Sequence, residues 1–129
     1  MPHVSGKFTV KSTPLDPTKL SEQLGLMQMK FEKKFEGALS AEGLVCMMGI
    51  MNQASGSGGY VAMEKITGEL EGKLGSFFFQ HSSVMNKGIP KQSITVVPGS
   101  GCDALAGLSG ELTIHIKEGQ HFYEFRYEI

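Results

Sequence analysis

Glycine recurs along this chain at intervals that match the length of a β-strand. The chain has 17 glycines in 129 residues, and strand-length segments lie between most of them. The clearest segment is Met27 to Glu36, in which apolar and polar side chains alternate. Met27, Met29, Phe31 and Phe35 share one parity, and Gln28, Lys30, Glu32, Lys34 and Glu36 share the other. A period of two predicts a half-buried strand.

The same test predicts seven further strands. They lie at about Val4 to Ser12, Leu39 to Asn52, Tyr60 to Leu70, Ser76 to Val84, Lys91 to Val97, Glu111 to Lys117 and Gln120 to Glu128. Their connections are short: Glu71-Gly72 and Glu118-Gly119 suit two-residue hairpins, and Ser55 to Gly59 suits a flexible tip. Such connections favour antiparallel neighbours.

One short helix is predicted near residues 17–24. Asp16 can cap it, Pro17 suits its first position, and Leu20 and Leu24 lie one turn apart. So short a helix cannot cover an open sheet of eight strands, whereas closure removes the exposed edges. We therefore predict an all-β fold, an eight-stranded antiparallel closed barrel formed by one domain over residues 1–129, with a β-sandwich as the alternative.

The charge balance argues against nucleic acid as a partner. Twelve basic residues face 13 acidic ones, and the sequence pI is about 6.4, so the basic excess of a phosphate-binding surface is missing. The N-terminus has no basic region followed by an apolar run, and no segment approaches the ~18 apolar residues that span a bilayer. We expect a cytoplasmic protein without a membrane partner.

The segment from Leu44 to Met51 is apolar on both parities. A barrel strand should be polar outside, so the second apolar face predicts a homo-oligomer, with a dimer favoured. Within this run, Cys46 is expected to be a small buried hydrophobic residue, because a nucleophile would need a base that the sequence does not reveal. Cys46 and Cys102 lack CxxC spacing and are expected to be reduced.

A glycine-dense segment follows the strand that ends near Val97. Residues 99–104, GSGCDA, match the G-x-G-x-x-A pattern of dinucleotide-binding domains. That fingerprint needs a helix behind it, but Gly107 and Gly110 interrupt the following residues and a β-alternating run begins at Glu111. We predict a wide turn across the barrel mouth, and no cofactor.

Three motifs together resemble those of a family of small uncharacterised bacterial proteins whose fold is similar to the allene oxide cyclase barrel. They are FEKKFEGALSAEG, YVAMEKITGELEGKLGSFFFQHSS and VVPGSGCDALAGLSGE, in this order, and the resemblance extends from Gly6 to Glu128. A more distant likeness links the Gly-x-Gly then x-Gly-x-x-Gly pattern to plant allene oxide cyclases and dirigent proteins. The resemblance implies an eight-stranded barrel and no established activity.

Three ionisable residues stand on otherwise apolar faces. Lys33 interrupts the Met27 face, Glu64 shares its face with Tyr60, and His81 shares its face with Phe77 and Phe79. With Glu71-Gly72 as the hairpin tip, Glu64 lies opposite Phe79 and diagonal to His81, within reach across the ladder. Two interpretations stay open: a carboxylate and an imidazole that work in a cavity, and a structural role, either as an ion pair or as side chains that emerge at the barrel rim.

The candidate site also includes residues beside this group. The candidate catalytic residues are Glu64 and His81, and the candidate ligand-binding residues are Lys33, Tyr60, Glu64, Gln80, His81 and His121. His121 shares its parity with Tyr123, and the alternative interpretation is an ordinary core histidine. A metal site formed by Glu64, His81 and His121 has no short ligand spacing in its favour, so no metal is predicted.

Three functions fit these features. The first is a barrel that binds a small apolar molecule, and the second is an isomerase or cyclase that acts on a hydrophobic substrate in the same cavity. The third is a non-catalytic interaction module whose barrel is packed solid. Eight Met and eight Phe are enough either to line a cavity or to fill it.

Overall fold

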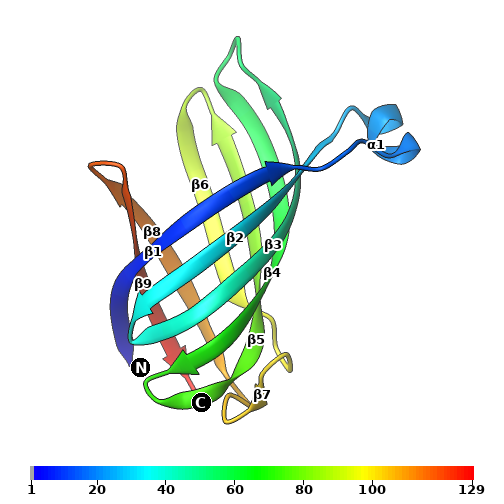
Figure 1. Cartoon of the computed structure of the whole chain (residues 1–129). Helices are drawn as coiled ribbons and strands as arrows, with labels where there is room; N and C mark the ends of the chain where they lie inside the picture. Colours follow the sequence, from blue (N-terminus) through cyan, green and yellow to red (C-terminus); the bar gives the residue numbers. More distant parts are fainter. Residues whose placement is uncertain (1) are drawn as a thin grey trace.

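Eight long strands close into an antiparallel barrel in the computed structural model, which describes residues 2–129 (Figure 1). The elements are β1 (His3–Pro14), α1 (Lys19–Leu24), β2 (Met27–Gly37), β3 (Leu39–Asn52), β4 (Ser57–Leu70), β5 (Lys73–Asn86), β6 (Ile89–Val96), β7 (Cys102–Asp103), β8 (Ser109–Lys117) and β9 (Gln120–Glu128). The order around the wall is β1-β2-β3-β4-β5-β6-β8-β9, and β9 pairs with β1 to close it. The predicted fold class is confirmed.

Two hairpins set the register as predicted. Leu70 pairs with Lys73 across Glu71-Gly72, and Lys117 pairs with Gln120 across Glu118-Gly119. Both residues of each turn have positive φ, which is the backbone that matches the twist of a two-residue hairpin. The β3–β4 tip is shorter than predicted, because β4 already begins at Ser57.

The helix is present, but its cap differs from the prediction. Thr18, not Asp16, is the N-cap: its hydroxyl accepts a bond from the Ser21 amide at 3.0 Å, and the Ser21 hydroxyl accepts one from the Thr18 amide at 2.8 Å. This reciprocal pair satisfies two free amides at once, which a single Asp16 side chain cannot do. Gly25, with φ of 73°, ends the helix. The helix lies at the end of an arm that projects from the barrel (Figure 1).

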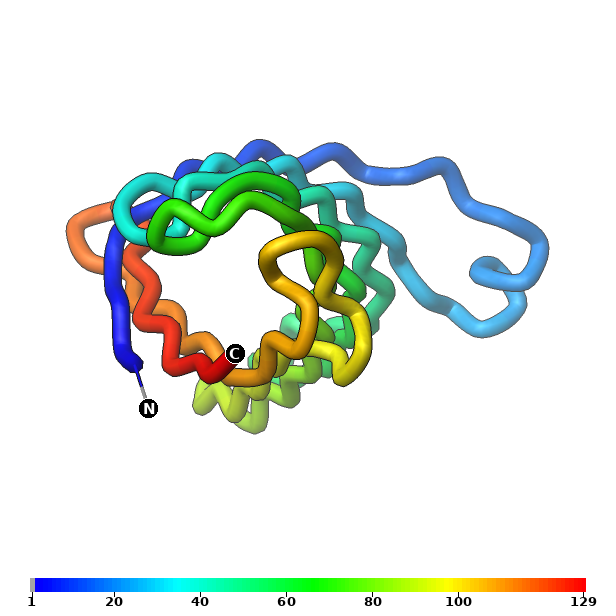
Figure 2. The backbone as a smooth tube through the Cα atoms, turned by 90° about the horizontal axis from the view of Figure 1, so that it is seen from below, coloured from blue at the N-terminus to red at the C-terminus, as the bar shows by residue number. Residues whose placement is uncertain are grey.

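One end of the barrel is closed by the glycine-dense segment. Residues 97–108 fold inward over one side of the opening (Figure 2), and Leu105 and Leu108 insert into the core with 1% and 2% of their surface exposed. The segment is tied to β5 by the Ser100 hydroxyl, which accepts from the Phe78 amide at 3.0 Å, and by the unpredicted two-residue strand β7. In this part of the described chain, turns and β7 follow Gly101 where a dinucleotide fold would have a helix.

The interior therefore has two halves. Sixteen buried residues form a solid core at the closed end, among them Phe77, Phe79 and Phe125, while only Val45, Met47 and Ala62 form the buried cluster toward the other end. No helix within residues 2–129 is long and apolar enough to cross a membrane.

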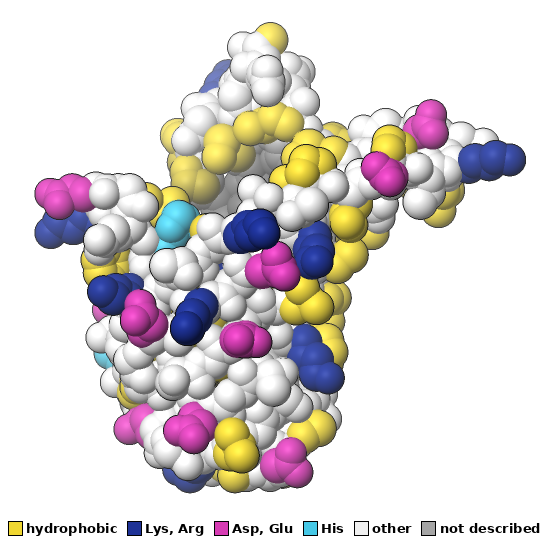
Figure 3. All heavy atoms as spheres, in the orientation of Figure 1, with side chains coloured by type: hydrophobic (Ala, Val, Ile, Leu, Met, Phe, Trp, Pro, Cys, Tyr) yellow, Lys and Arg dark blue, Asp and Glu magenta, His cyan; other side chains and the backbone are white. Residues whose placement is uncertain are grey.

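The outer surface of β3 and β4 is apolar, and it corrects one prediction. Cys46 is exposed, not buried, because Val45 and Met47 take the inward positions of β3. Both parities of this strand are apolar, so hydrophobicity alone could not show which one faces the core. The β3–β4 outer face comprises Leu44, Cys46, Met48, Ile50, Val61 and Met63, and part of it is visible along one edge in Figure 3.

Candidate functional site

Three ionisable side chains meet inside the barrel, between the solid core and the opposite half. Oε1 of Glu64 lies 2.7 Å from Nε2 of His81 and 3.2 Å from Nζ of Lys33. The side chains of Glu64, His81 and Lys33 expose only 1%, 4% and 9% of their surface. A buried carboxylate is stable in a protein interior when cationic and hydrogen-bonding partners compensate it, and both kinds are present here.

Strand register brings this buried triad together. Glu64 pairs with Phe79 and Ala62 pairs with His81, so that Glu64 and His81 are diagonal neighbours on the inner face, as predicted. On the other side, Val45 pairs with Glu64 and Gly43 pairs with Lys33. The triad thus spans β2, β4 and β5, with β3 running between Lys33 and Glu64.

Gly43 makes room for the carboxylate. A Cβ atom at this position would lie 2.3 Å from Oε2 of Glu64 and 3.1 Å from a ring carbon of Phe35. Oε2 is also the one buried side-chain oxygen or nitrogen in the described chain that has no hydrogen-bond partner. The two carboxylate oxygens therefore differ: Oε1 is shared by two partners, and Oε2 is sealed against a glycine.

Aromatic rings surround the ammonium group of Lys33. Its Nζ lies 5.2 Å from the ring centroid of Phe8 and 5.9 Å from that of Phe35. Both distances are within the range of cation–π attraction, which grows as water is excluded. These rings hold the lysine inside the barrel beside Glu64.

A cavity of about 280 Å³ lies on the side of the triad away from the closed end. Figure 3 shows the hollow between the hairpin tips at that end. Eight apolar side chains line it: Phe8, Val10, Phe31, Val45, Met47, Ala62, Ile114 and Ile116. Five polar residues complete the lining: Lys33, Tyr60, His81, Gln92 and His121. Lys33 and His81 thus belong both to the buried triad and to the cavity wall, whereas Glu64 does not line the cavity.

The structure brings together most, but not all, of the predicted site residues. His121 lines the cavity with its ring 5.1 Å from that of Phe8, and the Tyr60 hydroxyl accepts a bond from Nε2 of Gln92 at 2.8 Å. Gln80 lies elsewhere: its side chain is exposed on the outer face of β5, because its parity is opposite to that of His81. Gln92 lines the cavity and was not predicted; its shared parity with the buried Ile94 was the available signal.

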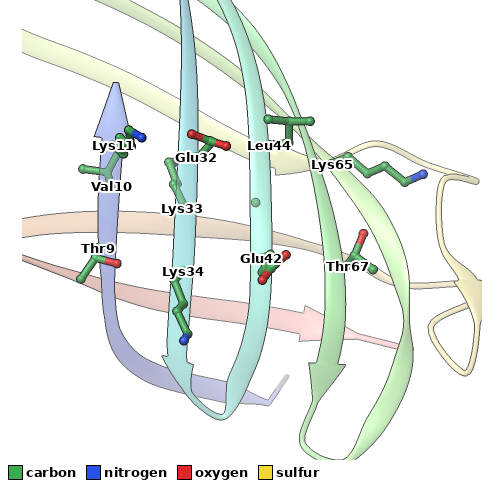
Figure 4. A pocket seen from close by; sticks show the side chains of 11 residues that line it. Thr9, Val10, Lys11, Glu32, Lys33, Lys34, Glu42, Leu44, Lys65 and Thr67 are labelled. Atoms are coloured by element: carbon green, nitrogen blue, oxygen red, sulfur yellow. The ribbon is translucent and has the colours of Figure 1, made fainter. Parts of the chain in front are cut away.

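A larger depression, of about 700 Å³, lies over the outside of β1 to β4 (Figure 4). Its outward side chains are mainly alternating charges: Lys11, Glu32, Lys34, Glu42 and Lys65. Charges of both signs on a solvated wall form neither an apolar cavity nor a surface of one sign, so the interior cavity is the stronger candidate site. Within residues 2–129 no group of three or more His, Cys, Asp or Glu side chains is arranged to hold a metal ion.

These features define a class: a small closed antiparallel β-barrel, plugged at one end, with an apolar cavity that lies directly above a buried Lys-Glu-His triad. Residues 4–127 match a family of proteins of unknown function, DUF3224, and the chain belongs to that family. A DUF3224 protein of unknown function from Shewanella oneidensis MR-1, known from a crystal structure, shares 40% sequence identity with this chain. The two structures superpose with a TM-score of 0.91. The match covers 100% of this chain and 98% of that one.

No curated protein matches the chain. The predicted membership of an uncharacterised family with a barrel fold is confirmed. The more distant likeness to allene oxide cyclases stays a prediction.

Proposed function

We propose that this protein binds a small, mainly apolar molecule in the barrel cavity, with Lys33 and His81 at the polar end of that molecule. The observation that carries this proposal is an apolar lining with Lys33 and His81 beside the buried Glu64 at its floor, and few other polar groups. Ligand sites in proteins typically have this composition, and the volume of about 280 Å³ is near the lower end of their usual range.

The packing of the two halves supports binding over a purely structural role. The closed end has a dense core of sixteen buried residues, which supplies the hydrophobic stabilisation of the barrel. The other half places Phe31, Ile114 and Tyr60 around open space, where larger side chains would have filled it. Apolar surface left in contact with a cavity is the usual sign of a ligand site.

Methionine methyl groups offer a direct test. Met47 lines the cavity, whereas its neighbour Met48 is 39% exposed on the outer face. We expect decanoate or decanol, added to protein labelled with ¹³C at the methionine methyls, to shift the Met47 signal in a saturable way and to leave Met48 unchanged. Native mass spectrometry of freshly purified protein would then identify a molecule that co-purifies.

A matched pair of variants links binding to the cavity. Ala62→Leu would fill the cavity and abolish the Met47 shift, whereas Val61→Leu places the same leucine side chain outside the barrel, where Val61 is 52% exposed. Equal binding by the Ala62→Leu and Val61→Leu variants would refute the proposal.

An isomerase or cyclase is the second candidate, and the His81–Glu64 contact favours it. A carboxylate that accepts from one ring nitrogen orients an imidazole for proton transfer, and His81 lines the cavity. A trial unsaturated fatty-acid epoxide separates the two functions: a binder returns it unchanged, while an enzyme converts it and loses that activity in His81→Phe.

A further inference from the structure

The polar groups that line the cavity include the hydrogen-bond donors of Lys33 and no accessible carboxylate. No Asp or Glu belongs to the residues that line it. Glu64, the nearest acid, lies beneath the floor, with Oε1 shared by Lys33 and His81 and Oε2 sealed against Gly43. A ligand that offers a positive charge would meet the ammonium of Lys33 without a carboxylate to pair with.

Lys33 has unused hydrogen-bonding capacity. An ammonium group has three N–H donors, and the one hydrogen bond that Nζ makes within the described chain goes to Glu64. Nζ also lies over the rings of Phe8 and Phe35, which attract a cation but accept no conventional hydrogen bond. A pure hydrocarbon that displaced water from this floor would leave donors of a charged group unsatisfied, which is costly.

The charges around the floor also favour an anion. Lys33 and Glu64 balance each other, and the remaining ionisable side chains that line the cavity are His81, His121 and Tyr60. The lining holds no acid to face a cation, whereas an anion would meet the ammonium group of Lys33. The cavity therefore accommodates an added negative charge more readily than an added positive one.

From these contacts we infer that the ligand is a carboxylic acid with an apolar tail, whose carboxylate lies at the floor and accepts hydrogen bonds from Lys33. The tail lies among the apolar side chains toward the open end, between Phe31, Met47 and Ile116. Charged hydrogen bonds in a water-poor site are stronger than neutral ones, so the head group gives selectivity and the tail gives apolar affinity. This inference rests on the proposed function and names its ligand class.

Three probes with one tail test the inference: decanoate, decanol and decylamine. The Met47 methyl signal reports cavity occupancy for each, and Met48 is the internal control. We expect decanoate to bind roughly tenfold or more tightly than decanol, as a charged hydrogen bond predicts, and decylamine to bind most weakly.

Lys33→Met tests the residue itself. It is combined with Glu64→Gln, so that no buried charge is left alone and the barrel folds. In this double variant we expect decanoate to lose its advantage over decanol, while decanol still binds. The control is Lys34→Met, whose side chain points outward on the same strand and which should keep the full preference.

The failures are distinguishable. If decanol and decanoate shift Met47 with equal affinity, or the preference survives in Lys33→Met/Glu64→Gln, the carboxylate inference is wrong and the binding proposal stands. If none of the three probes shifts the Met47 signal, the proposed function fails, and this inference fails with it.

Discussion

The carboxylate of Glu64 occupies the space that a side chain at Gly43 would need. A Cβ atom there would lie 2.3 Å from Oε2, well inside any normal contact. The backbone of Gly43 is ordinary strand, so the reason for a glycine at this position is steric. We therefore expect Gly43→Ala to lower the free energy of unfolding by roughly 1–3 kcal/mol, the usual cost of overpacking.

A double-mutant cycle checks that cause. In the Lys33→Met/Glu64→Ala background the clashing carboxylate is absent, so Gly43→Ala should cost clearly less in urea unfolding. Gly59→Ala on β4 is the matched control, because its Cβ would meet the Ser83 carbonyl oxygen at an ordinary 3.5 Å. An equal cost of Gly43→Ala in both backgrounds would assign it to something other than Glu64.

Neutralising Glu64 in the buried triad should strongly lower the free energy of unfolding. Glu64→Gln leaves Lys33 with 9% side-chain exposure and no counter-charge, a situation that typically costs roughly 3–5 kcal/mol. We expect Lys33→Met/Glu64→Gln to recover most of that loss in chemical denaturation. A double variant as unstable as Glu64→Gln would mean that His81, not Lys33, is the partner that matters for folding.

Because of Tyr127, the stability of the barrel should fall as the pH rises through the alkaline range. Burial, together with its hydrogen bond to Glu71, raises the pKa of this phenol from 10.0 to about 12. The unfolded chain therefore loses the proton first as the pH rises, so this contribution is complete below pH about 10 and is lost between about 10 and 12.

The same pKa shift gives a measurable difference between two variants. Tyr127→Phe should flatten the fall in stability over that alkaline range, and Tyr60→Phe, at the cavity, should not. Burial also raises the pKa of Tyr123, so tyrosinate absorbance should show late ionisation in both variants. An unchanged alkaline profile for Tyr127→Phe would contradict the assignment.

The β3–β4 outer face is expected to contact a second copy of the chain. Leu44, Ile50 and Val61 each expose more than half of their surface there, a patch that water does not favour. Sedimentation at micromolar concentration should show a dimer, and Val61→Lys should convert it to a monomer. Thr113→Lys on the outer face of β8 is the control.

The two cysteines report on the same contact. Both are exposed in the isolated chain, but only Cys46 belongs to the β3–β4 outer face. In a dimer Cys46 should react with a thiol reagent more slowly than Cys102, and Val61→Lys should remove that difference. Equal reactivity at all protein concentrations would argue against this interface.

Much of the barrel could be predicted because the two-residue turns and the period of two act locally. The Glu71-Gly72 turn sets the register of β4 against β5, and from that register follows the contact between Glu64 and His81. Lys33 could be placed on the same inner face by its parity alone.

Other features depend on contacts between distant segments, and local patterns do not contain them. The outward position of Cys46 could not be predicted because a strand that is apolar on both parities gives no signal. Gln80 faces outward because its parity is opposite to that of His81. The role of Gly43 and the plug formed by Leu105 and Leu108 follow from side chains that meet across the barrel. The spacing of residues within one strand does not predict such contacts between distant segments.

The plug also gives the cavity a direction. With residues 97–108 across one end, a molecule that reaches Lys33 must arrive through the hairpin tips, head group first, and leave by the same route in reverse. The head group, which enters first, then determines which molecules the cavity accepts. Tails of different length could extend toward solvent beyond Ile116, so that a series of homologous acids, and not one compound, would share this barrel.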